Sequence, residues 1–125
     1  MLLGSGIDII EIERIAAALD RFGDQFCNRI FLRGEIQYCR SKRNSAESFA
    51  ARFAAKEAAA KALGTGIQSG VGWKDIEVVH TISGKPEIRF HGRAFAIASQ
   101  IGATGVTVSL THTRALAMAQ VLLEQ

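Results

Sequence analysis

NSAESFAARFAAKEAAAKALG, residues 44–64, is the stretch around which the rest of the chain can be arranged. Asn44 is a good helix N-cap, and Glu47 follows three residues later, as in a capping box. The interior is almost entirely Ala, Phe, Lys, Glu and Arg, and Gly64 fits the position just after a helix end. The stretch therefore predicts a long helix that ends at Leu63.

Apolar residues cover two faces of this predicted helix. One face is a stripe of larger side chains, formed by Phe49, Phe53, Ala60 and Leu63. The other is a broad face of alanines at positions 50, 51, 54, 55, 58 and 62. Because both faces can be buried, we expect the helix to be packed on most of its sides.

The same helix carries four charged residues, Arg52, Lys56, Glu57 and Lys61. Arg52 and Lys56 are four residues apart, and such a like-charge pair weakens an isolated helix by roughly 0.2–0.5 kcal/mol unless an anion lies between the two. Glu57 and Lys61 have the favourable order for an ion pair. The pattern alone fits either a solvated charged edge or a site that binds an anion.

Shorter elements lie before and after the long helix. Hydrophobic patterns predict strands at residues 2–10, 75–82, 87–90, 106–110 and 116–123. They predict further helices at residues 11–22, 24–30, 34–40 and 93–101. With no internal repeat and no domain boundary, this order predicts a single α+β domain over residues 1–125 with an antiparallel sheet.

Composition narrows the class of protein. Apolar residues make up 48% of the 125 and charged residues 22%, as in ordinary globular proteins, so disordered and collagen-like chains are excluded. Cys27 and Cys39 are twelve residues apart, which excludes a disulfide scaffold and a four-cysteine zinc site. No apolar run is long enough for a membrane span, and no leader pattern precedes the first strand. We therefore expect a cytoplasmic protein with reduced thiols.

Charge is concentrated in the middle of the chain. The net charge is +3, but residues 14–61 hold ten basic and five acidic groups, after an acidic start with Asp8, Glu11 and Glu13. This balance predicts an anionic partner. A small anion, a nucleic acid and an acidic protein are all compatible with it.

Asp8 interrupts the apolar run Ile7-Asp8-Ile9-Ile10. Alternation along a strand places Asp8 and Ile10 on one face, and Ile7 and Ile9 on the other. Burying a carboxylate is costly unless something compensates it. Taken alone, the pattern favours a solvated acid on an edge strand over a functional carboxylate.

Four segments together resemble the holo-[acyl-carrier-protein] synthase family of 4′-phosphopantetheinyl transferases. They are GIDIIEIERI at 6–15, RFAAKEAAAKALGTG at 52–66, GKP at 84–86 and SLTHT at 109–113. The second segment is the most specific, and the resemblance spans residues 4–123. It implies the family fold, an antiparallel sheet packed around the helix at about 44–64. It also implies a homotrimer with active sites between subunits, for which apolar strand residues are available at Val106, Val108, Leu110, Met118 and Leu122.

The implied reaction is transfer of the 4′-phosphopantetheine group of coenzyme A to a serine of apo acyl carrier protein, a step of fatty acid biosynthesis that releases adenosine 3′,5′-bisphosphate. The resemblance implies that Asp8 and Glu57 bind Mg²⁺, which suits a metal that combines few carboxylates with phosphate oxygens and waters. It assigns catalysis to Glu57, Lys56 and Asp8. The base that takes the serine proton stays open between Glu57, a metal-bound water and Glu11.

The resemblance also implies binding residues. Contacts with coenzyme A are expected from Arg52, Lys56, Lys61, Gly64, Pro86, His112 and Thr113. Arg14 and Arg21, seven residues apart on the predicted helix over 12–22, are expected to contact the acidic carrier protein.

Two other classes of function compete with this reading. A module that binds nucleotide diphosphates without catalysis would bind coenzyme A without turnover. A small basic nucleic-acid binder is disfavoured by the aromatic content of 7%, the modest net charge and the lack of a recognised motif. We expect neither nucleic acid nor a membrane as a partner.

Overall fold

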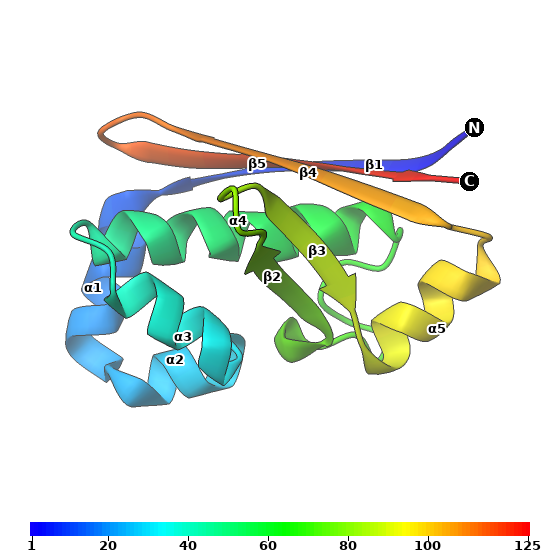
Figure 1. The fold of residues 1–125 in the computed structure, drawn as a ribbon. Helices are drawn as coiled ribbons and strands as arrows, with labels where there is room; N and C mark the ends of the chain where they lie inside the picture. Colours follow the sequence, from blue (N-terminus) through cyan, green and yellow to red (C-terminus); the bar gives the residue numbers. More distant parts are fainter.

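The helix predicted at 44–63 lies at the centre of the molecule (Figure 1). The computed structural model describes residues 1–125, and this helix, α4, spans Ser45–Ala62. Asn44 caps it, because its Oδ1 accepts a hydrogen bond from the backbone N–H of Glu47 at 3.2 Å. The Glu47 carboxylate accepts from the Asn44 side-chain amide and not from its backbone, so the capping box is incomplete. Gly64 follows the helix with a φ of +85°, as its position requires.

A three-stranded antiparallel sheet covers one side of α4 (Figure 1). Its strands, in spatial order, are β1 (Leu2–Glu11), β5 (Leu116–Glu124) and β4 (Gly105–His112). The expected edge position of the first strand is therefore confirmed. A separate hairpin of β2 (Ile76–His80) and β3 (Pro86–Phe90) packs beside α4.

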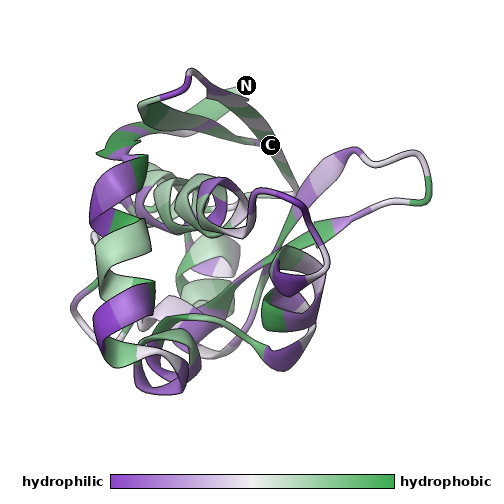
Figure 2. Cartoon of the chain, turned by 90° about the vertical axis from the view of Figure 1, so that its left-hand side faces the viewer, coloured by the Kyte–Doolittle hydropathy of each residue, from purple (hydrophilic) through white to green (hydrophobic).

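The remaining helices lie below the sheet (Figure 1). They are α1 (Ile12–Phe22), α2 (Asp24–Ile30), α3 (Arg33–Arg40) and α5 (Gly92–Gln100), with a 3₁₀ turn, η1, at Trp73–Asp75. Of these helices, α1 and α3 pack against α4. Figure 2 shows α4 end on, beneath the sheet and surrounded by other elements. Ten of its residues are buried, Arg52 and Lys56 among them, which confirms that it is packed on most sides. No helix combines the length and apolar character that crossing a bilayer requires.

β1 approaches α4 unusually closely. A Cβ added at Gly6 would lie 1.9 Å from the carbonyl oxygen of Ala58, and one added at Gly4 would lie 2.2 Å from that of Ala62. Only glycine therefore allows the strand backbone to rest directly on the helix backbone. Since side chains alternate along a strand, the next residue on this face is Asp8.

The inner face of the sheet packs on α4 and forms much of the core. Val106, Val108 and Leu110 of β4 pair across the sheet with three residues of β5 that are fully buried. These β4 residues therefore lie on the inner face of the sheet, where Val106 and Leu110 are only partly buried and line cavities, and the expectation that they serve a subunit interface stays a prediction. Alternation divides a strand into two faces, but it does not say which face is turned inward.

The outer face of the sheet is uncovered, and apolar side chains of β1 and β5 share it with polar ones such as Gln120 and Ser109. Ile7 and Ile9 of β1 are 56% and 53% exposed. Met118 pairs with Ile9, and Leu122 follows it on the same face of β5. Large exposed apolar side chains that share a surface are typical of a site of protein–protein contact.

The predicted boundaries of the strands and helices agree with the structure to within two residues. The 3₁₀ turn over Trp73–Asp75 was not predicted. The α+β class and the antiparallel pairing are as the sequence indicates.

Candidate active site

Asp8 and Glu57 lie on the walls of one cavity of about 340 Å³. Asp8 comes from β1 and Glu57 from α4, so the close packing of strand and helix places them together. The Asp8 side chain is only 17% exposed, and its Oδ1 lies 3.1 Å from Nζ of Lys61. Lys61 Nζ also donates to the carbonyl oxygen of Ile7 at 3.1 Å. The Asp8 carboxylate is thus fixed by an ion pair with Lys61. The sequence pattern of the strand alone favoured a freely solvated acid.

The Glu57 carboxylate is destabilised as an anion. Burial raises its pKa above the ordinary value, Asp8 raises it further, and Lys61 partly opposes both effects. The two carboxylates are therefore close enough to repel each other, and a cation near both would relieve that repulsion. No group of three or more metal-ligating side chains exists in the chain. Two carboxylates nevertheless suit Mg²⁺, which commonly combines one or two carboxylates with substrate phosphates and waters.

Arg14 of α1 reaches the same cavity. The rest of the lining is mostly apolar and includes Ile10, Ile15, Ala18, Phe26 and Phe53. Arg21 is not part of this lining, and its guanidinium lies over the ring of Phe22, 5.2 Å from the centroid. Of the two arginines expected to contact a carrier protein, Arg14 alone lies beside the acidic pair.

Lys56 lies in the interior, away from this cavity. Its side chain is 0% exposed, and Nζ donates to Oε1 of Glu35 at 2.8 Å and to the carbonyl oxygens of Trp73 (3.0 Å) and Ile76. An ammonium group has three donors, and all three are used. Lys56 therefore has no donor left for a phosphate or a reacting group, contrary to the catalytic and coenzyme A roles expected for it.

Glu35 is the anion that balances Lys56. Its Oε1 accepts from the backbone N–H of Leu32 at 2.8 Å, and Oε2 accepts from that of Val78 at 2.9 Å. Burial lowers the pKa of Lys56, and the Glu35 carboxylate opposes that shift. This ion pair, whose hydrogen-bonding groups are all satisfied, links α3, α4 and β2. The local sequence pattern does not predict it.

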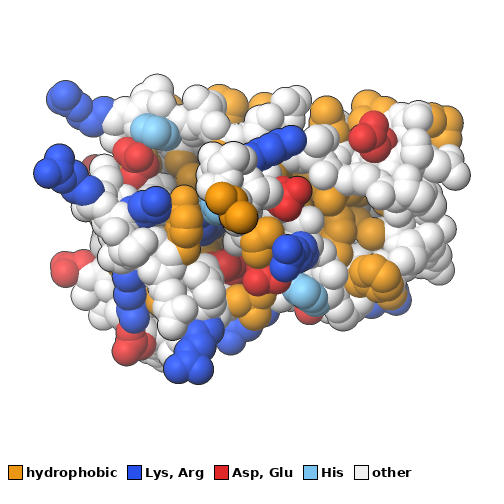
Figure 3. All heavy atoms as spheres, in the orientation of Figure 1, with side chains coloured by type: hydrophobic (Ala, Val, Ile, Leu, Met, Phe, Trp, Pro, Cys, Tyr) orange, Lys and Arg blue, Asp and Glu red, His pale blue; other side chains and the backbone are white.

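A second cavity, of about 490 Å³, is strongly basic. It lies near the N-terminal end of α4 and contains Arg52 and His112, both of which were expected to bind coenzyme A. The other cationic or imidazole side chains on its walls are Lys42, Arg43 and His80. Its one acid is Glu47, whose Oε1 lies 3.2 Å from Nε2 of His112. Figure 3 shows Lys and Arg side chains concentrated at the end of the molecule where α2 and α3 lie.

Arg52 is buried in the wall of this basic cavity. Its Nη1 donates to the carbonyl oxygen and Oγ of Ser48 at 3.1 and 3.0 Å, and Nη2 lies 2.9 Å from Nδ1 of His80. Nε is buried without any partner. An unsatisfied buried donor costs about 1–3 kcal/mol, so this site favours a ligand that brings an acceptor.

The two cavities lie on different faces of α4. Arg52 and Glu57 are five residues apart, which corresponds to a rotation of about 140° around a helix. The remaining predicted coenzyme A residues are also dispersed. Gly64 follows the C-terminal end of α4, Pro86 opens β3, and the Thr113 hydroxyl accepts from the N–H of Leu116 in the β4–β5 turn. A single copy therefore gathers only some of the predicted residues into two partial sites and leaves Gly64, Pro86 and Thr113 outside both.

Sequence reasoning missed four residues of the basic cavity, namely Tyr38, Lys42, Arg43 and His80. Lys42 and Arg43 had a signal, because they belong to the polar, basic loop before α4. His80 had none. It reaches the cavity because the β2–β3 hairpin packs beside α4. This contact joins segments that are far apart in the sequence, so no local pattern predicts it.

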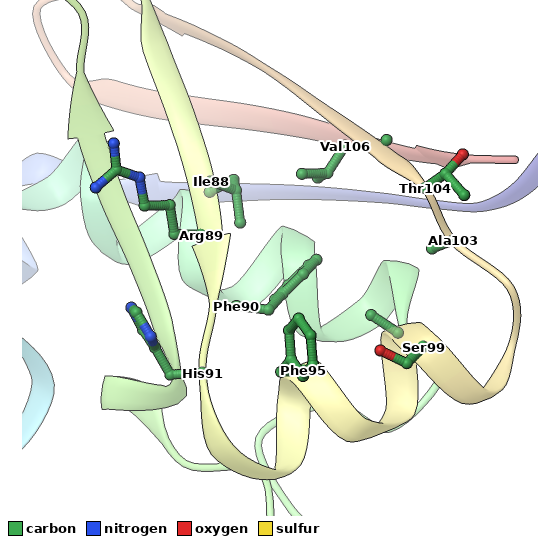
Figure 4. A pocket seen from close by; sticks show the side chains of 11 residues that line it. Ile88, Arg89, Phe90, His91, Phe95, Ser99, Ala103, Thr104 and Val106 are labelled. Carbon is green, nitrogen blue, oxygen red and sulfur yellow. The ribbon is translucent and has the colours of Figure 1, made fainter.

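A third pocket, of about 380 Å³, lies between β3, α5 and β4. Figure 4 shows Phe90 and Phe95 next to each other on its wall, with Val106 opposite. None of the predicted site residues lines it.

Known proteins resemble this chain over its whole length. Residues 4–119 match the family described as the 4′-phosphopantetheinyl transferase superfamily. The holo-[acyl-carrier-protein] synthase of Koribacter versatilis is 52% identical over 124 residues, 99% of each chain. The corresponding protein of Solibacter usitatus is 48% identical over the same coverage.

Solved structures show the same fold. The crystal structure of holo-[acyl-carrier-protein] synthase from Neisseria meningitidis matches with a TM-score of 0.89 and 34% identity, over 100% of both chains. The enzyme from Helicobacter pylori in complex with coenzyme A matches with a TM-score of 0.85 and 30% identity, over 96% of this chain and 99% of that one. The chain therefore belongs to the holo-[acyl-carrier-protein] synthases of the 4′-phosphopantetheinyl transferase superfamily.

Proposed function

We propose that Asp8 and Glu57 form the metal-binding centre at which this chain transfers the 4′-phosphopantetheine group of coenzyme A to a serine of apo acyl carrier protein. The supporting observation is the pair itself. Two carboxylates from β1 and α4 line one cavity, and burial together with repulsion from Asp8 raises the pKa of Glu57. Bound Mg²⁺ would neutralise charge on the diphosphate and on the leaving adenosine 3′,5′-bisphosphate.

Glu57 lies beside Asp8 in the cavity and would be one candidate for the base that takes the serine proton, with a metal-bound water as the other. Glu11 is less suitable, because alternation along β1 turns it to the face opposite Asp8.

Coenzyme A would be held by Lys61 next to Asp8 and by the basic groups of the second cavity. Lys61 lies beside Asp8 and is half exposed, so its ammonium can turn to the diphosphate. Arg52, His112, Lys42 and Arg43 line the basic cavity and suit a further phosphate of the same molecule. The complex of the Helicobacter pylori enzyme with coenzyme A supports this choice of ligand. Lys56 would stabilise the fold and would not contact the substrate.

A homotrimer would bring the two partial sites together. The uncovered apolar face formed by Ile7, Ile9, Met118 and Leu122 is suited to contact with another copy. A cavity of one subunit could then lie against the complementary cavity of its neighbour. This arrangement would explain why the predicted coenzyme A residues are separated within one chain.

The acidic carrier protein would dock on α1. Arg14 is exposed on this helix and reaches the acidic cavity, so an acidic helix paired with it would lie next to the reacting groups. Charge attraction of this kind acts mainly on the encounter rate and weakens with salt. We propose the cytoplasm as the compartment, in keeping with two buried free cysteines.

The test is transfer in solution. The purified chain is incubated with coenzyme A, Mg²⁺ and apo acyl carrier protein, and the carrier is weighed by mass spectrometry. The carrier should gain one phosphopantetheine group. Asp8→Asn and Glu57→Gln should each abolish the gain and should also abolish stabilisation of the fold by Mg²⁺ in thermal unfolding.

Glu77→Gln is a matched control, because Glu77 is a partly exposed acid paired with His91 outside both cavities. It should transfer at the wild-type rate. Coenzyme A binding without any mass gain would instead indicate a binding module. Full activity in the Asp8 or Glu57 variant would refute the metal assignment.

A further inference from the structure

The Arg52 guanidinium depends on an acceptor from another part of the chain. Nη2 lies 2.9 Å from Nδ1 and 3.1 Å from Nε2 of His80, at the end of β2. A guanidinium carries donors only, so the imidazole nitrogen that faces it must accept. His80 can do this only as a neutral ring, since a protonated imidazole has no free lone pair.

Tyr38 provides the surface on which both groups rest. Its ring stacks on the His80 ring, with centroids 4.3 Å apart and planes 12° from parallel. The Arg52 Cζ atom lies 4.1 Å from the centroid of the same tyrosine ring. An aromatic ring attracts a guanidinium and limits its rotation. Tyr38 of α3 and His80 of β2 thus fix the plane of Arg52 of α4.

The surroundings of His80 keep it neutral. Burial lowers its pKa most, and the positive charges of Arg52 and Lys42 lower it further, to about 4. Lys42 lies over the Tyr38 ring, 4.5 Å from its centroid, so a second cation approaches the same stack. No acid pairs with His80, because the Glu47 carboxylate of this cavity lies against His112. At neutral pH His80 is therefore an uncharged acceptor in a cationic cavity.

We propose that His80, seated on Tyr38, is a positioning residue that holds the Arg52 guanidinium ready for a phosphate group of coenzyme A. The inference rests on the proposed function, which assigns that ligand to the basic cavity. Ser48 and His80 engage the two terminal nitrogens of Arg52, while the buried Nε is left without a partner. A guanidinium fixed in this way loses little freedom when a phosphate binds. His80 should thus contribute to the affinity for coenzyme A and have no effect on the rate of the transfer step.

His80→Phe is the decisive variant. Phenylalanine keeps an aromatic ring to stack on Tyr38 but offers no acceptor to Arg52. Steady-state transfer kinetics should show the KM for coenzyme A raised about tenfold, with kcat and the KM for the carrier protein unchanged. Isothermal titration calorimetry with coenzyme A alone should show the same loss of affinity. His80→Gln, whose amide oxygen can accept, should recover most of it.

A double-mutant cycle tests whether His80 acts through Arg52. In an Arg52→Ala background, adding His80→Phe should cause no further change in the affinity for coenzyme A. His91→Phe is the matched control, because His91 is a half-exposed histidine that pairs with Glu77 away from the basic cavity. It should behave as the wild type. Thermal unfolding establishes that each variant is folded.

The possible results separate the inference from the function. If His80→Phe has the same KM and affinity for coenzyme A as the wild type, the inference is overturned. Transfer by the wild type would still support the proposed function. Independent effects of the Arg52 and His80 changes, or a loss of kcat alone, would overturn it as well. Wild-type binding of coenzyme A without transfer would refute the function, and calorimetry of the variants would still decide the role of His80. Absence of coenzyme A binding in the wild type would overturn both.

Discussion

Lys56→Met should destabilise the fold and spare the chemistry. The Lys56 and Glu35 side chains are 0% and 1% exposed and are joined at 2.8 Å. Removing one partner of a buried ion pair costs about 3–5 kcal/mol, because the other charge is left buried and unpaired. For a chain of 125 residues, this corresponds to a fall in Tm of roughly 10–20 °C. Met was chosen because it preserves most of the side-chain volume.

The cost can be assigned to the pair by a second substitution. Urea unfolding, followed by circular dichroism, gives the free energy of unfolding for the wild type, Lys56→Met, Glu35→Gln and the double variant. Each single change should be strongly destabilising. The double variant should lose much less than the sum of the two, because neither charge is then left alone.

Activity completes the test. Transfer per folded molecule, measured well below the lowered Tm, should equal that of the wild type. If Lys56→Met unfolds at the wild-type urea concentration yet transfers no phosphopantetheine, the structural role assigned here is refuted. That result would support the catalytic role of Lys56 that the family resemblance implied.

Three further changes probe other parts of the molecule. Because the folded state raises the pKa of Glu57, wild-type stability should fall as pH rises from the ordinary value of 4.5 through that raised pKa. In urea unfolding at pH 7, Glu57→Gln should therefore have a larger free energy of unfolding than the wild type. This difference should vanish well below pH 4.5. Equal stability of the two proteins at pH 7 would contradict the repulsion described above. Met118→Glu places a charge on the outer face of the sheet and should convert the proposed homotrimer to monomers in sedimentation velocity, with an unchanged circular dichroism spectrum. Arg14→Glu should raise the KM for the carrier protein at low salt, an effect that shrinks as salt is added; a salt-independent change would point to lost packing.

Local patterns predicted the parts of the structure that depend on local chemistry. The helix over 45–62 follows from its cap, its composition and the glycine after it. Asp8 was recognisable because a carboxylate is out of place in an apolar strand. Its meeting with Glu57 came from the family resemblance, since the two lie 49 positions apart and no periodicity relates them.

The rest depends on tertiary packing. Lys56 looked like a free cation, because its partner Glu35 is 21 residues away on another helix. His80 looked unremarkable in a hairpin, and its contact with Arg52 spans 28 residues. Val106 on β4 and Met118 on β5 are both apolar, and only the packing on α4 shows that the first faces inward and the second outward. Buried polar pairs and the choice of sheet face are global properties that a single sequence does not encode locally.

The direct contact between β1 and α4 has a consequence for reading mutational data. In a saturation scan, substitutions at Gly4 and Gly6 should score as severely as those at Asp8, although neither glycine touches a reacting group. The three positions would form an apparent catalytic motif at the start of the chain. The amount of soluble protein separates them, since variants at the glycines should be depleted from the cell while Asp8 variants accumulate as inert protein. Intolerance in this strand therefore records two different demands, one for backbone proximity and one for charge.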